Sequence, residues 1–137
     1  MAEAMILIDS SILIRVLRDG NGFMARRFRG LIRRRDWALT RFVQLELLCG
    51  CRDDVEFEDL SDYLDNQSYV EVSDSTWIEG ARMFSQLKSV GITIRSKLDC
   101  CIAQVAMAND LPLYHVDNDF EQIARHFPLK QHRLHDR

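Results

Sequence analysis

The sequence has no segment suited to a membrane and no secretory signal. None of its apolar runs approaches the roughly 18 residues that cross a bilayer. The N-terminus also lacks a basic region followed by a small-residue cleavage site. We therefore expect a cytoplasmic protein that does not associate with membranes.

Cysteines are few and do not have the spacing of a zinc site. The four cysteines form two close pairs, Cys49 with Cys51 and Cys100 with Cys101, without C-x-x-C spacing or neighbouring histidines. Adjacent cysteines also bridge each other poorly, so we expect reduced thiols that pack in helices. Repeats, linkers and low-complexity tracts are absent as well. A chain of 137 residues then predicts a single domain, 1–137, with a core that needs no disulfides.

The chain has only a small net charge, but each of its two halves has a strong excess of one sign. Residues 1–52 hold 10 Lys and Arg against 5 Asp and Glu, and residues 53–137 hold 8 against 16, so net charges of +5 and −8 give −3. The basic bias comes from Arg26, Arg27, Arg29, Arg33, Arg34 and Arg35; the acidic bias comes from Asp53, Asp54, Glu56, Glu58, Asp59, Asp62 and Asp65. The arginines could bind a polyanion or could form a solvated helix face, and charge alone does not separate these readings.

The hydrophobic pattern predicts alternating strands and helices. Strands are expected over 5–8, 37–39, 69–72, 113–116 and 130–134, and helices over 11–18, 23–34, 42–49, 55–64, 76–90, 97–109 and 120–126. Thr76 and Glu79 have the spacing of a capping box at the start of one helix. Such alternation predicts an α/β fold with a mostly parallel sheet of about five strands covered on both faces. Crossovers of one hand place the carboxyl ends of those strands at one edge, where ligands bind.

Five carboxylates stand in positions that favour a shared site. Asp9 directly follows the first strand, and Asp117 and Asp119 follow the strand over 113–116. Glu46 and Asp99 lie in apolar helical segments, FVQLELLCG and KLDCCIAQVA. Each one alone could cap a helix or form a salt bridge. Together at one edge they would repel one another unless a cation lay among them, and hard oxygen ligands favour Mg²⁺ or Mn²⁺ over zinc.

Four motifs in order along the chain resemble the PIN-domain ribonucleases, in particular the VapC toxins of toxin–antitoxin pairs. They are Asp9 followed by Ser10-Ser11, Thr40 six residues before Glu46, IRSKLDCCIAQVA around Asp99, and LYHVDNDFEQIA around Asp117. The resemblance covers essentially the whole chain. It implies a single PIN domain over 1–137, a three-layer α/β/α sandwich.

The resemblance also implies a site and a reaction. Asp9, Glu46, Asp99 and Asp117 would form the catalytic, metal-binding quartet for Mg²⁺ or Mn²⁺, and Asp119 would support or share the site. Ser10 would orient Asp9, and Thr40 would support the carboxylates without binding the ion. The expected reaction is in-line attack of a metal-activated water on an RNA phosphodiester, which leaves a 5′-phosphate and a 3′-hydroxyl.

The expected partners are RNA and protein. Arg95 and Lys97 come just before Asp99 and could reach an RNA phosphate, balance the acidic pocket or simply be exposed; Arg26 and Arg27 are the other candidate RNA contacts. The resemblance implies a VapB-type antitoxin whose C-terminal segment crosses the acidic groove. It also implies a homodimer and a toxin–antitoxin hetero-oligomer.

Other readings of the sequence are weaker. A haloacid-dehalogenase-like phosphatase needs a second aspartate where Ser11 stands, and a response-regulator receiver needs paired acids and a lysine that the sequence does not place. A non-catalytic PIN-like module that binds RNA or protein is the remaining alternative. Replacement of Asp99 by asparagine separates the two functions, because a binding module keeps its affinity whereas a nuclease toxin loses its toxicity.

Overall fold

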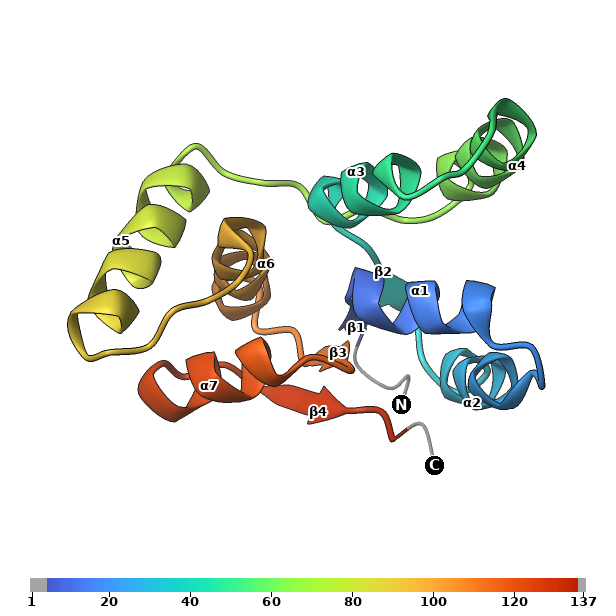
Figure 1. The fold of residues 1–137 in the computed structure, drawn as a ribbon. Coiled ribbons are helices and arrows are strands. Elements are labelled where there is room, and N and C mark those ends of the chain that lie inside the picture. Colours follow the sequence, from blue (N-terminus) through green and yellow to red (C-terminus); the bar gives the residue numbers. More distant parts are fainter. Residues whose placement is uncertain (1–4, 136–137) are drawn as a thin grey trace.

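The centre of the molecule is a parallel sheet with strand order β2-β1-β3-β4 (Figure 1). A computed structural model describes residues 5–135. The strands are β1 (Ile6–Ile8), β2 (Trp37–Ala38), β3 (Leu113–His115) and β4 (Gln131–Arg133). Every pairing between neighbours is parallel. The carboxyl ends of the strands therefore meet at one edge, as the sequence pattern predicts.

The prediction of about five strands is one too many for the described residues. The segment predicted as a strand over 69–72 pairs only through a single bridge, between Tyr69 and Leu39, the residue that follows β2. Two hydrogen bonds form this bridge, from the Leu39 amide to the Ser68 carbonyl and from the Val70 amide to the Leu39 carbonyl. Pairing goes no further because the neighbouring chain turns at Thr40 to begin a helix.

Within residues 5–135, seven helices are found where the sequence predicts them, with ends that differ from the predicted ones by at most two residues. They are α1 (Ser10–Arg18), α2 (Phe23–Ile32), α3 (Arg41–Cys49), α4 (Asp54–Asp65), α5 (Ser75–Ser89), α6 (Lys97–Ala108) and α7 (Asn118–His126). α2 ends two residues before the predicted boundary because the Ile6 amide binds the Asp36 carbonyl at 3.0 Å, which requires the chain to turn before Asp36. None of the described helices combines the length and apolar character needed to traverse a bilayer.

Helices cover both faces of the sheet, as expected for three layers. The register of the strands puts Trp37 on the same face as Ile6, and the Trp37 ring packs edge-on against Phe28 of α2 at 5.4 Å between centroids. His115 points to the opposite face, where its ring lies 5.2 Å from that of Phe120 in α7. All three residues of β1 are fully buried between these layers. The residue that directly follows β1 therefore has its backbone next to the centre of the core.

Close packing between α5 and α6 fixes the helix that carries Asp99. Gly80 of α5 approaches α6 so closely that a Cβ atom there would lie 2.8 Å from the Cys101 sulfur. Cys100 and Cys101 are free thiols buried in the core, as predicted. Cys49 is also free but is exposed at the end of α3, so its predicted packing role is wrong.

The predicted capping box of α5 is absent. The helix begins at Ser75, so Thr76 already lies inside its first turn and is buried. Glu79 pairs instead with Arg82 at 3.6 Å. The sequence spacing is correct for a capping box, but the helix starts too early for Thr76 to serve as its cap.

Candidate metal centre

Asp9 links the end of β1 to the start of α1. Its backbone amide continues the pairing with β3 by donating to the Tyr114 carbonyl at 3.0 Å. One carboxylate oxygen, Oδ2, caps α1 by accepting from the Ser11 amide at 2.9 Å. The other oxygen, Oδ1, is buried without a hydrogen-bond partner in the described chain, and the residue is only 2% exposed. Helix capping therefore occupies Oδ2 and leaves Oδ1 available to a cation.

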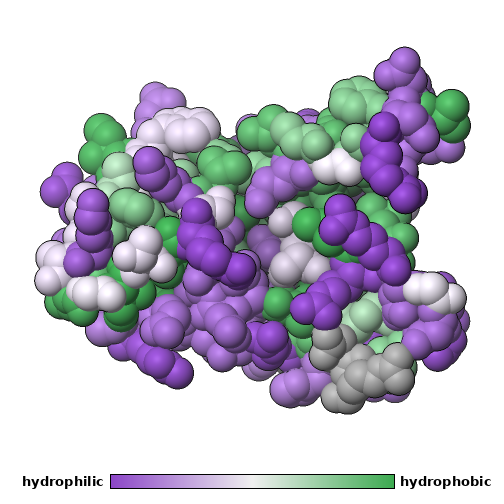
Figure 2. Space-filling view, in the orientation of Figure 1, coloured by the Kyte–Doolittle hydropathy of each residue, from purple (hydrophilic) through white to green (hydrophobic). Residues whose placement is uncertain are grey.

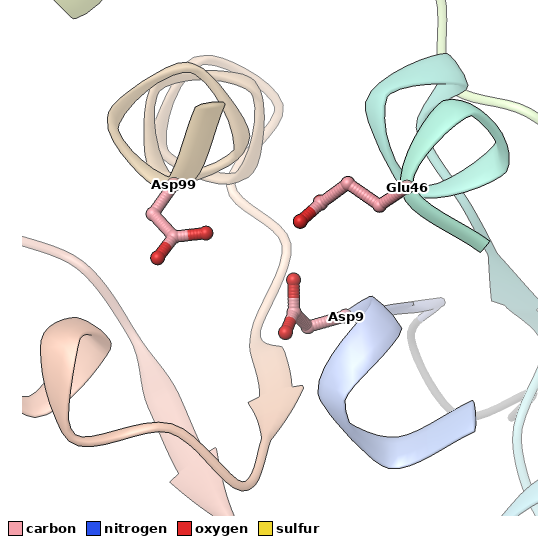
Figure 3. A group of neighbouring side chains, drawn as sticks. All are labelled: Asp9, Glu46 and Asp99. Atoms are coloured by element: carbon pink, nitrogen blue, oxygen red, sulfur yellow. The ribbon is translucent and has the colours of Figure 1, made fainter. Parts of the chain in front are cut away.

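Glu46 and Asp99 point toward Asp9 from two other elements (Figure 3). Glu46 comes from α3 and Asp99 from the first turn of α6. One carboxylate oxygen from each of the three residues lies within 4.8 Å of the others, and we call this set the inner triad. The Glu46 Oε1 atom is also buried without a partner in the described residues. Buried polar atoms are normally hydrogen-bonded, so two unpartnered oxygens within one cluster of carboxylates call for a positive group among them.

A second set of carboxylates shares Asp99. One oxygen each from Asp99, Asp117 and Asp119 lies within 4.8 Å of the others, and we call this set the outer triad. Asp117 caps α7, since its Oδ1 accepts from the Asp119 amide at 2.9 Å. The predicted quartet plus Asp119 is thus divided into two overlapping groups. Asp117 belongs to the outer triad, and its negative charge still acts on Asp9 and Glu46, where it adds to the effect of burial in raising the pKa of both.

Burial and mutual repulsion weaken the acidity of these groups. Burial, followed by the negative charge of Asp9, raises the pKa of Glu46 to about 7, and the nearby Ser10 hydroxyl partly offsets this rise. Burial and the charges of Asp9 and Asp117 raise the pKa of Asp99 to about 8. The pKa of Asp9 is raised too, mainly by burial. Without a cation, Asp99 and a part of the Glu46 population therefore keep their protons near neutral pH.

The donor set fits a hard divalent cation. The inner triad offers carboxylate oxygens and no nitrogen or sulfur, which suits Mg²⁺ or Mn²⁺. The unpartnered Oδ1 of Asp9 and Oε1 of Glu46 are free to become ligands without breaking a described hydrogen bond. The residues present therefore match the group that the sequence predicts.

Hydroxyl groups support the site from behind. Thr40 is fully buried and caps α3, since its Oγ1 accepts from the Val43 amide at 3.3 Å, and it thereby supports the helix that bears Glu46. Ser10 is buried beside Glu46, and its predicted orienting action on Asp9 stays a prediction. The sequence reading missed Ser11, whose Oγ accepts from the Val116 amide at 2.9 Å and so ties the end of β3 to α1. Its place two residues after Asp9 was the available signal.

The four predicted RNA-contacting residues lie in different places. Arg95 contacts the outer triad directly, with its Nη2 3.0 Å from Asp117 Oδ1. Lys97 is exposed, with its ammonium 5.7 Å from the centre of the Phe84 ring. Arg26 and Arg27 are exposed on α2, and no contact described for residues 5–135 joins them to either triad.

A groove leads away from the inner triad between α1, α2, α3 and α4. It has a volume of about 1220 Å³, and its lining combines aliphatic and aromatic side chains with charged ones, among them Glu46. Leu17, Val55 and Tyr63 in its lining are 61%, 71% and 44% exposed. Figure 2 shows hydrophobic side chains next to hydrophilic ones in the hollow on the right of the molecule, between α4 above and α2 below. A groove with apolar side chains in its lining that shares Glu46 with the acidic site is suited to binding a protein segment.

A parallel α/β sheet with buried carboxylates at its carboxyl edge defines a class of proteins that bind ligands or cations at that edge. The PIN domain family model matches residues 6–126. The chain belongs to the PIN domain family.

Similar proteins and structures agree with this membership. "Ribonuclease VapC11" of Mycobacterium tuberculosis (strain ATCC 25618 / H37Rv) and "VapC ribonuclease Mb1587" of Mycobacterium bovis are each 29% identical over 124 residues, which cover 88% of this chain and 92% of theirs. Among solved structures, VapBC2 from Rickettsia felis bound to a promoter DNA fragment has a TM-score of 0.75 at 16% identity and covers 96% of this chain and 99% of its own. VapBC-1 from nontypeable Haemophilus influenzae has a TM-score of 0.72 at 16% identity, with coverages of 94% and 97%. At this identity the structures establish the shared fold.

Proposed function

We propose that this chain is a metal-dependent endoribonuclease and the toxin of a toxin–antitoxin pair. The observation that carries the proposal is the pair of buried, unpartnered oxygens, Asp9 Oδ1 and Glu46 Oε1, on two residues that cluster with Asp99 at the carboxyl edge of the sheet. In a purely structural site these carboxyls would have to be buried either as unpaired charges or in the protonated form, and both states cost stability. The curated relatives named as VapC ribonucleases support RNA as the substrate.

The inner triad would hold the ion. Asp9 is fixed by its bond to the Ser11 amide, Glu46 by the capped helix α3, and Asp99 by the first turn of α6. When bound, Mg²⁺ or Mn²⁺ supplies an activated water and stabilises the negative charge that develops on the phosphodiester. Attack by water in line with the leaving oxygen breaks the bond between phosphorus and the 3′ oxygen, which takes up a proton. The products carry a 5′-phosphate and a 3′-hydroxyl.

Cleavage of a mixed RNA pool tests this function. The purified chain is incubated with Mg²⁺, Mn²⁺ or EDTA, and the ends of the products are mapped. We expect cuts that need the metal and leave 5′-phosphates. Cuts that persist in EDTA and end in cyclic phosphates would contradict the mechanism, and no cutting with either metal by protein free of antitoxin would favour a non-catalytic binding module.

Arg26 and Arg27 are proposed to bind RNA phosphates outside the acidic site. Each phosphate contact to single-stranded RNA contributes about −0.7 to the slope of log affinity against log salt. In an Asp99→Asn background, which is expected not to cut RNA, Arg26→Ala with Arg27→Ala is expected to weaken RNA binding and reduce that slope by about 1.4. Fluorescence anisotropy over a series of salt concentrations measures both quantities.

A matched pair of cations provides the control for this prediction. Arg82 and Lys88 are exposed on α5, and their double replacement by alanine removes the same charge from another face. The control should leave the salt slope nearly unchanged. If both double variants reduce the slope equally, RNA is bound by the overall charge rather than by α2.

The groove beside Glu46 is proposed to bind a VapB-type antitoxin. A segment with apolar side chains fits its lining, and a basic side chain at one end could reach Glu46. Leu17→Asp places a charge in this lining and is expected to weaken antitoxin binding at least about tenfold, because apolar anchors dominate such interfaces. The measurements are antitoxin affinity and rescue of cell growth when both proteins are co-expressed.

An equally exposed position outside the groove controls for nonspecific effects. Val90 is 61% exposed at the end of α5 and does not line the groove, so Val90→Asp should leave antitoxin binding unchanged. Both variants should cut RNA normally in isolation. Normal neutralisation of the Leu17→Asp variant by the antitoxin would indicate that the antitoxin binds outside the groove.

The homodimer expected from the family stays a prediction.

A further inference from the structure

The two triads differ in the charge that surrounds them. Within residues 5–135, no ion pair reaches Asp9, Glu46 or Asp99, and the inner triad includes both unpartnered buried oxygens. The outer triad, in contrast, has a guanidinium group against two of its three members. Only the inner triad therefore lacks a positive partner among the described residues.

Arg95 is bound to the outer triad at three points. Its Nη2 donates to Asp117 Oδ1 at 3.0 Å, and its Nε lies 3.5 Å from Asp119 Oδ2. Its backbone amide also donates to Asp119 Oδ2, at 3.0 Å. The residue stands in the short loop just before α6, so the same loop also positions Asp99. Main chain and side chain together hold the positive charge in place.

The hydrogen bonds of Asp117 and Asp119 oppose a metal ion at the outer triad. Asp117 Oδ1 accepts from both the Asp119 amide and the Arg95 guanidinium. Asp119 Oδ2 accepts from the Arg95 amide. A divalent ion there would have to displace the guanidinium and would meet its positive charge at close range. The carboxylates of the inner triad have no such competitor.

We propose that Arg95 is the resident cation of the outer triad, so that the chain binds one divalent ion, at Asp9, Glu46 and Asp99. Arg95 then stands where a second ion would bind. In two-metal nucleases the ions are about 3.5–4 Å apart and share a carboxylate, and here Asp99 is the shared residue. The inference rests on the proposed metal dependence of the site. The side chain of Arg95 is 76% exposed, so its charge also faces the solvent from which RNA would approach.

Titration of the RNA-free protein with Mn²⁺ tests the proposal. Isothermal calorimetry gives the number of bound ions, and electron paramagnetic resonance detects magnetic coupling between two neighbouring Mn²⁺ ions. We expect one ion in the unaltered chain and two coupled ions in Arg95→Gln. Arg95→Lys keeps the positive charge and is expected to restore a single ion. Circular dichroism confirms that each variant is folded.

A further variant separates charge from geometry. Adding Asp119→Asn to Arg95→Gln removes one ligand of the outer triad and should return the count to one ion. Two ions in the unaltered chain, or one ion in both the unaltered chain and Arg95→Gln, would overturn the role of Arg95. Failure of the unaltered chain to bind any ion would instead overturn the proposed metal dependence, and the role of Arg95 with it. RNA cleavage does not enter this measurement.

Discussion

Asp9→Asn is expected to lower the rate of RNA cleavage by more than about 100-fold, because loss of a residue that merely supports a metal ligand already costs about 10–100-fold. The buried Oδ1 atom of Asp9 is the proposed ligand, and the amide of asparagine offers no negative charge to an ion. Initial rates of cleavage in saturating Mg²⁺ measure the loss. A rate within a few-fold of the unaltered chain would place the ion away from the inner triad.

The same substitution is expected to leave the metal-free protein at least as stable. The asparagine side chain would keep an oxygen that can accept from the Ser11 amide, so the cap of α1 remains possible. The substitution also removes a buried negative charge that repels Glu46 and Asp99. Thermal unfolding in EDTA should therefore show an equal or higher midpoint, which separates loss of activity from loss of structure.

Asp62→Asn is the matched control for Asp9→Asn. It makes the same chemical change at an exposed position of α4, away from both triads. Cleavage and metal binding should be unchanged in this variant. Equal losses in both variants would indicate that net charge, rather than the inner triad, controls activity.

The parallel sheet and the approximate position of the site could be predicted from the sequence. Short apolar runs between helical patterns do not give the strand order, but they show which residues follow each strand. Asp9 and Asp117 could therefore be placed at the carboxyl edge before the structure was known. The missing fifth strand depends on where Thr40 ends the pairing of β2, which is a tertiary contact that local pattern does not contain.

The division of the carboxylates into two triads could not be predicted from the sequence. It depends on how α3 and α6 approach the sheet and on which oxygen of Asp117 caps α7. The contact between Arg95 and Asp119 joins residues 24 positions apart, so no local spacing signals it. The sequence identified the charged residues, and packing decided which of them meet.

The stability of the metal-free protein is expected to fall as the pH rises from about 6.5 to 8.5. The pKa of Glu46 rises from an ordinary value of 4.5 to about 7, and that of Asp99 from 3.8 to about 8. In this range the folded protein still binds protons that the unfolded chain has lost, so the stability that they contribute is lost as the pH rises through the folded pKa values. Below pH ~6.5 the lowered pKa of buried His115 acts in the opposite direction, so the higher window is the informative one.

Divalent metal should reverse this pH dependence. An ion at the inner triad requires charged carboxylates, so protons compete with it and its affinity rises with pH through the same window. The midpoint of thermal unfolding, measured with EDTA and with saturating MgCl₂, should therefore differ little at about pH 6 and most at about pH 8.5. Glu46→Gln removes one titrating group and one charge that raises the pKa of Asp99, so it should flatten the fall in EDTA. If the midpoint of thermal unfolding in EDTA instead rises with pH across this window, the carboxyls are already ionised without a metal. A positive charge other than the metal ion would then stabilise them.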